Sequence, residues 1–184
     1  MNKLKKLLVF TLISGFVYSV NAQVNVTSTM AASATIVAPI AISSTSAMGF
    51  GNLSVTGVGT VKMLAANGSF VNSGLAQAID AAGTPGEIVI TGKIGENFKI
   101  TVAQTTALTI SGDSDATAKR EMSLFTAKVG IAGVEAAVPV TTGLSASLDG
   151  SGDATVKIGA TLSTIASQKN GLYAGEISIV FSYE

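Results

Sequence analysis

The stretch LYAGEISIVFSY, residues 172–183, decides the fold. Its odd-numbered residues form one face, which consists of Tyr173, Gly175, Ile177, Ile179, Phe181 and Tyr183. Its even-numbered residues form the other face, which consists of Leu172, Ala174, Glu176, Ser178, Val180 and Ser182. An alternation of apolar and polar residues with period two is typical of a β-strand that is buried on one face. We therefore expect one strand over residues 172–183, with its odd-numbered side chains toward the core.

Shorter runs of the same kind occupy most of the remaining chain. Strands are predicted over residues 33–44, 57–65, 122–129 and 155–165. The runs 87–91 and 98–102 are separated by Gly92, Gly95 and Asn97, which predicts a hairpin. Residues 75–82, between Gly74 and Gly83, are the one place where we expect a short helix. Many short strands with glycine-rich turns predict an all-β fold, a single β-sandwich domain.

The composition excludes several classes of catalytic and metal site. The 184 residues include no Cys, no His and no Trp. Thiol nucleophiles, disulfides, imidazole metal ligands and a Ser-His-acid triad are therefore impossible. Lys and Arg number 11, Asp and Glu also number 11, and this balance offers no basic surface to nucleic acid. No motif pairs a nucleophile with an activating base, so we expect no enzymatic activity, no cofactor and no metal.

Two clusters of carboxylates could offer oxygen ligands to calcium. Asp113 and Asp115 form one cluster, and the sequence DGSGD, residues 149–153, forms the other. Neither has the EF-hand spacing with its closing Glu, and calcium needs about six to eight oxygen ligands. Asp and Gly are also the residues that tight turns prefer. We therefore expect two turns, with a calcium site as the weaker alternative.

The first 22 residues have the pattern of a secretory signal peptide. Three lysines precede an apolar stretch over residues 7–20, and Val20-Asn21-Ala22 is a small-residue cleavage site. The apolar stretch is shorter than the ~20 residues that a membrane-spanning helix needs. We expect a signal peptide over 1–22, an N-terminal extension over 23–36 and a β-sandwich over 37–184. The chain would be exported through the periplasm to the cell surface or medium, and would not be an integral membrane protein.

A set of weak motifs is spread along the rest of the chain. They are ATIVAPI (34–40), MGFG (48–51), GTV (59–61), ITG (90–92), GATL (159–162) and GLYAG (171–175), followed by the closing aromatic strand. This pattern resembles domain-of-unknown-function family 4402, a group of secreted bacterial β-sandwich proteins. That family is in turn similar to pilins of the chaperone–usher kind. The resemblance implies an immunoglobulin-like, pilin-like β-sandwich, although pilins often carry a disulfide and this chain has no Cys.

Such pilins resemble an immunoglobulin fold that lacks its last strand, and the N-terminal extension of the next subunit fills the gap. The extension of this chain alternates in the way that an inserted strand requires. We expect its donor face to consist of Val24, Val26, Met30, Ala32 and Ala34, with Ser28 and Ile36 on the same side. We expect the acceptor groove to be lined by Tyr173, Ile177, Ile179 and Phe181. An uncovered strand edge beside this groove would be closed by the donor.

The function expected from this resemblance is a structural subunit of a bacterial surface fibre, a fimbrium. Its partners would be further copies of itself, with a periplasmic chaperone and an outer-membrane usher. The same alternation also fits an extension that pairs within its own subunit. The alternative is a monomeric secreted binding module for a glycan or protein, which would need exposed aromatics. Phe50, Phe70 and Phe125 are the residues left for such a platform.

Overall fold

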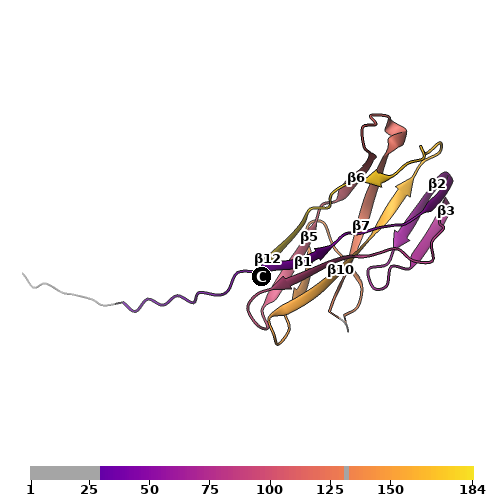
Figure 1. Cartoon of the computed structure of the whole chain (residues 1–184). Coiled ribbons are helices and arrows are strands. Elements are labelled where there is room, and N and C mark those ends of the chain that lie inside the picture. Colours follow the sequence, from indigo (N-terminus) through magenta and orange to yellow (C-terminus); the bar gives the residue numbers. More distant parts are fainter. Residues whose placement is uncertain (1–29, 131–132) are drawn as a thin grey trace, which may run out of the picture. The chain divides into compact units, whose positions relative to one another are not determined.

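The computed structural model describes residues 30–130 and 133–184, and all of its regular structure lies in the compact unit Ile36–Glu184. The signal peptide predicted over residues 1–22 therefore lies outside the described residues, as do Val24 and Val26. Two antiparallel sheets make up the unit, and one short 3-10 turn, η1 (Ala116–Ala118), joins two strands (Figure 1). The all-β prediction is confirmed. No helix among the described residues has the length and apolar character that crossing a membrane requires.

The larger sheet contains nine strands. Its main path runs β1 (Ala41–Ser46), β4 (Gly86–Thr91), β10 (Asp153–Thr164), β7 (Lys119–Val129), β6 (Thr105–Ile110) and β11 (Tyr173–Ala174). The hairpin of β2 (Leu53–Met63) and β3 (Phe70–Ala78) joins this path through β10, and β8 (Ala136–Ala137) pairs with β7. The smaller sheet has the order β12 (Ile179–Tyr183), β5 (Asn97–Val102) and β9 (Leu144–Ser147).

Strand β10 organises the larger sheet. Its first half pairs with β4 from Asp153 to Ile158, and its second half pairs with β2 from Ala160 to Thr164. The strands β4 and β2 therefore share one edge of β10, while β7 occupies the other edge. At the junction, a side chain at Gly159 would collide with the backbone of β2, which explains the glycine.

The core lies between the two sheets and is mostly aliphatic, with a few phenylalanines. Its largest fully buried side chains are Phe98, Met63, Ile90, Ile100, Ile158, Val61 and Val156. They come from β2, β4 and β10 of the larger sheet and from β5 of the smaller sheet. The alternating burial of β4 and β5 places every second residue in this core.

The structure corrects the single strand predicted over residues 172–183. The segment contains two strands, because β11 pairs with β6 of the larger sheet and β12 pairs with β5 of the smaller sheet. The chain therefore leaves one sheet and enters the other between residues 174 and 179. The alternation itself holds, since Tyr173, Ile177, Ile179, Phe181 and Tyr183 all pack against the core.

The strand expected over residues 33–44 begins only at Ala41 and ends at Ser46. Two further predictions were wrong. The runs 87–91 and 98–102 are not a hairpin, because β4 and β5 belong to different sheets. Two successive strands bury alternate residues whether they pair as a hairpin or belong to two facing sheets. The sequence pattern therefore does not distinguish the two arrangements. The helix expected over residues 75–82 is the second half of β3 and a bend. There Gly74 has a φ of 70°, and pairing with β2 overrides the local helical composition.

Candidate functional site: an apolar groove

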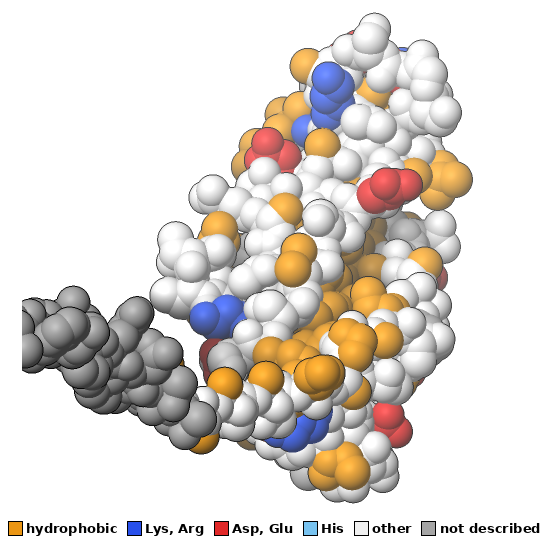
Figure 2. Space-filling model, turned by 90° about the vertical axis from the view of Figure 1, so that its left-hand side faces the viewer, with side chains coloured by type: hydrophobic (Ala, Val, Ile, Leu, Met, Phe, Trp, Pro, Cys, Tyr) orange, Lys and Arg blue, Asp and Glu red, His pale blue; other side chains and the backbone are white. Residues whose placement is uncertain are grey.

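An open groove with a volume of about 1640 Å³ runs along the domain, and we call it the apolar groove. One side is formed by residues 45–53, which connect β1 to β2, and the other side by residues 168–177 with Ile179. Its floor is hydrophobic and comes from β4, β6, β7 and β10: Ile88, Leu108, Met122, Ile158 and Leu162. Figure 2 shows hydrophobic side chains gathered in a hollow between two flanking ridges.

The floor is one continuous face of the larger sheet. Ile158 is paired directly with Gly86 of β4, and Leu162 is paired directly with Met122 of β7. Directly opposed residues of an antiparallel sheet point to the same face. The alternation of these strands therefore brings the aliphatic side chains to one surface, which the smaller sheet covers only in part.

The strands that border the groove have unpaired edges. Within the described part of the chain, β1 pairs only with β4, and β12 pairs only with β5. Thr45 and Ser46 of β1 and Ile179 of β12 all line the groove. An edge strand presents unpaired N–H and C=O groups that bind a further strand. The apolar groove thus combines a hydrophobic floor with backbone groups that are suited to an extended peptide.

One end of the groove is polar. Arg120 lines the groove and is only 7% exposed, and its Nη2 donates to the Thr117 carbonyl at 2.8 Å. The same carbonyl accepts from the Lys169 backbone N–H at 3.3 Å and lies 2.9 Å from the Tyr173 hydroxyl. The Arg120 Nε and the side-chain oxygen of Gln168 are buried, and neither has a hydrogen-bond partner among the described residues. Arg120 was not among the site residues expected from the sequence, although it shares the inward alternation of Met122 on β7.

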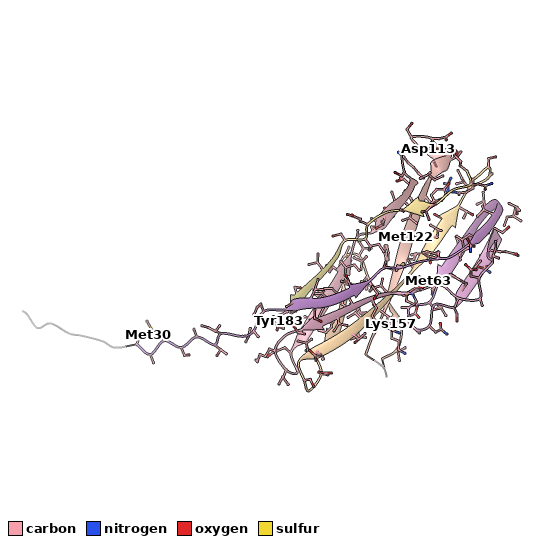
Figure 3. All side chains as sticks on the ribbon, in the orientation of Figure 1. Met30, Met63, Asp113, Met122, Lys157 and Tyr183 are labelled. Atoms are coloured by element: carbon pink, nitrogen blue, oxygen red, sulfur yellow. The ribbon has the colours of Figure 1, made fainter. Side chains whose placement is uncertain are left out.

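Charged groups surround this polar end. The Lys169 ammonium donates to the Asp113 carboxylate. This bond lowers the pKa of Asp113 and raises the pKa of Lys169. Asp115 caps η1, and bonds from the Thr117 backbone and hydroxyl lower its pKa. Figure 3 shows Asp113 at the end of the domain far from Tyr183.

Both aspartate clusters are turns, as predicted. Asp149 accepts from the backbone N–H groups of Asp153 and Ser151, which lowers the pKa of its carboxyl group. Asp113 accepts from the Asp115 backbone N–H in the other turn. Over residues 30–130 and 133–184, no three Asp, Glu, His or Cys side chains gather as a metal site.

At the opposite end of the domain, Tyr183 connects two segments through hydrogen bonds. Its hydroxyl donates to the carbonyl of Ala38 at 2.7 Å and accepts from the Lys93 backbone N–H at 2.7 Å. A side chain at Gly92 would collide with this hydroxyl. The segment that precedes β1 is therefore bound to the end of β12, and this contact fixes where the chain enters the domain.

The predicted acceptor residues lie in two places. Tyr173, Ile177 and Ile179 line the apolar groove. Phe181 does not, because its ring packs against Phe98 in the core with centroids 6.2 Å apart. Of the predicted donor face, Met30, Ala32 and Ala34 are described, and residues 30–40 form no strand.

The aromatic residues considered for a glycan platform are packed inward. Phe50 and Phe125 are buried, with exposed fractions of 9% and 4%. Phe70 is half-buried and stacks on Phe50 with ring centroids 6.3 Å apart. These three side chains therefore serve the core.

The model for "Domain of unknown function (DUF4402)" matches residues 40–183, which begin just before β1 and end with β12. The chain belongs to the DUF4402 family. The resemblance inferred from the motifs is confirmed, and the DUF4402 domain contains the whole apolar groove. Neither the curated proteins nor the solved structures that were searched contain a match.

Proposed function

We propose that this DUF4402 protein is a non-enzymatic structural subunit of a bacterial surface fibre. The N-terminal extension of one copy, residues 23–36, would insert as a strand into the apolar groove of the next copy. The single observation that carries the proposal is the hydrophobic groove bordered by the unpaired edges of β1 and β12. Repetition of the contact from copy to copy generates a linear polymer, because donor and acceptor are different surfaces.

The extension and the groove are chemically complementary. The floor residues Ile158 and Leu162 are apolar, and so is the donor face that begins with Val24 and Val26. An inserted strand would hydrogen-bond to the edge of β1 or β12, which gives affinity, and its alternate side chains would contact the floor. Burial of the donor face would supply the hydrophobic driving force.

This assembly also accounts for the fold. In this proposal, the two facing sheets and their open groove would be an immunoglobulin-like, pilin-like sandwich that one further strand completes. The polymer would form on the cell surface after export through the periplasm. A periplasmic chaperone that shields the groove and an outer-membrane usher are the partners that this route calls for.

A monomeric binding module is the second candidate. The same groove favours it, because an extended segment of an unrelated protein could pair with the β1 or β12 edge. The buried phenylalanines offer little to a glycan, so the ligand of such a module would be a peptide. This candidate requires no role for the extension, and that difference separates the two functions.

Removal of the extension tests the proposal. A chain that lacks residues 23–32 keeps every strand of the domain, so it should fold yet form no polymer. Mixed with the full-length chain, it should accept one donor and end the growing polymer, which shortens the ladder on an unboiled denaturing gel. A control chain with Thr27→Ser and Thr29→Ser, on the outward face, should polymerise normally. Fibres built from the truncated chain alone would contradict the proposal.

A further inference from the structure

Two Asn-Gly dipeptides occur in the chain, at residues 67–68 and 170–171. Asn170 and Gly171 line the apolar groove, on the side formed by residues 168–177. Asparagine is a thermolabile residue, and a following glycine favours its conversion because no Cβ hinders the approach of the glycine nitrogen to the asparagine side chain. Each dipeptide is therefore a place where the chain can modify itself without an enzyme.

The reaction uses only the chain and water. The glycine backbone nitrogen loses its proton and attacks the Cγ of the asparagine, which closes a succinimide ring and releases the side-chain nitrogen as ammonia. Water then adds to either carbonyl carbon of the ring and breaks the bond between that carbon and the ring nitrogen. The product is aspartate, or iso-aspartate, in which the main chain runs through the former side chain.

The fold restrains the first dipeptide against this reaction. Gly68 is buried, and its backbone N–H donates to the Leu64 carbonyl at 2.9 Å. The Asn67 side-chain oxygen accepts from the Ser69 backbone N–H at 3.1 Å. The attacking nitrogen and the side chain that it attacks are thus each held by another partner, and both hydrogen bonds must break before the ring can close.

The second dipeptide lacks both restraints. Asn170 and Gly171 are exposed and lie outside the strands. Within the described residues, the Gly171 N–H donates to no backbone carbonyl, and the side-chain hydrogen bonds of residues 168–173 belong to Lys169 and Tyr173. Ring closure at this dipeptide therefore breaks no hydrogen bond within the domain, and solvent is at hand to hydrolyse the ring.

We propose that Asn170 is a site of spontaneous deamidation, through which one side of the apolar groove acquires a carboxylate as the molecule ages. This inference does not rest on the proposed function. The new charge lies next to Lys169 and in the same groove as Arg120. Iso-aspartate also adds one main-chain atom between Lys169 and Tyr173, which both donate to the Thr117 carbonyl, at 3.3 Å and 2.9 Å. The modification therefore alters both the charge and the shape of the groove.

Labelling with heavy oxygen tests the site, because hydrolysis of the ring takes one oxygen atom from water. The purified full-length chain is incubated in mildly alkaline heavy-oxygen water, digested with pepsin in ordinary water at low pH, and mapped by mass spectrometry. In the folded chain, the peptide that contains Asn170 should gain the label at least about tenfold faster than the peptide that contains Asn67, because two hydrogen bonds must first break at Asn67. In strong denaturant, both peptides should gain the label at similar rates, since the two dipeptides are identical.

The outcomes at the two sites decide the proposal. Equal labelling of Asn67 and Asn170 in the folded chain, or faster labelling of Asn67, would overturn it. So would a folded chain in which Asn170 stays unlabelled although the denatured chain labels it. Asn170→Gln is the control for the position, because glutamine has to close a larger ring and reacts much more slowly. This variant should lose the label from its peptide and keep the slow labelling of Asn67, and a label that persists in its peptide would place the reaction elsewhere and overturn the proposal.

Discussion

A single carboxylate on the donor face should abolish assembly, whereas the same carboxylate one residue away should not. Ala31 and Ala32 are adjacent and identical in the sequence, but they belong to opposite faces of the extension. In the proposed complex, Ala32 faces the apolar floor and Ala31 faces solvent. Ala31→Asp is therefore a matched control for Ala32→Asp, with the same change in charge, volume and strand propensity.

The magnitude follows from the surroundings of the floor. Its residues Met122, Ile158 and Leu162 are apolar and at most 6% exposed. A fully buried carboxyl group without a partner has a pKa raised by about 3 units, and each unit is worth about 1.4 kcal/mol. Ala32→Asp should therefore weaken insertion by about 4 kcal/mol at pH 7, roughly a thousandfold.

The pH dependence distinguishes the buried charge from a steric effect. The pKa of the new carboxyl is raised in the filled groove, so its penalty is close to its full value at pH 7 and falls further as the group becomes protonated. At pH 5 the loss should shrink to about tenfold for a 3-unit shift. Ala31→Asp should stay within about threefold of the natural chain, as exposed substitutions do.

Assembly can be followed on unboiled denaturing gels and by the rate at which subunits exchange between labelled and unlabelled polymers. The reasoning is refuted if Ala31→Asp and Ala32→Asp behave alike, whether both assemble or both fail. It is also refuted if the loss caused by Ala32→Asp is the same at pH 5 and pH 7.

Three further predictions concern the domain itself. Phe181→Ala should lower the free energy of unfolding by about 3 kcal/mol, because the ring packs in the core. Val180→Ala, on the exposed face of the same strand, should lower it by less than about 1 kcal/mol. Urea denaturation measures both values. Tyr183→Phe removes the hydrogen bond to the Ala38 carbonyl and should lower the free energy of unfolding by about 1 kcal/mol. Backbone amides in the segment before β1 should then exchange hydrogen faster. Unchanged exchange in that segment would show that Tyr183 does not hold it to the domain. The lowered pKa of Asp149 stabilises the fold above its unfolded-state pKa. This contribution is lost as the pH falls through the folded pKa, so the free energy of unfolding should decrease below about pH 4. Asp149→Asn should flatten that dependence; an unaltered acid profile would exclude the contribution of Asp149.

The alternation of residues 172–183 was sufficient to predict which side chains face the core. It was not sufficient to predict that the chain changes sheets between Ala174 and Ile179, because a strand pair within one sheet and a crossing between two sheets bury the same alternate residues. The same ambiguity produced the mistaken hairpin of β4 and β5.

Part of the lining of the apolar groove was predictable from the sequence, and its polar end was not. Three of the four expected acceptor residues line the groove. The fourth, Phe181, instead packs against Phe98 on the neighbouring strand. The floor and Arg120 come from strands that are distant in sequence, and only their pairing brings them together. An arginine with the inward alternation of β7 was the one available signal, but it lay outside the strand predicted from residue 122.

The central claim is that the groove of one copy holds the extension of another. Its most direct test is a denaturing gel of material sheared from the surface of cells that produce the full-length protein, with unboiled and boiled samples side by side. The account predicts a ladder of multiples that collapses to one band on boiling, because strand insertion makes the polymer kinetically stable. A single monomer band in both lanes, with the protein in the periplasm or medium, would contradict it.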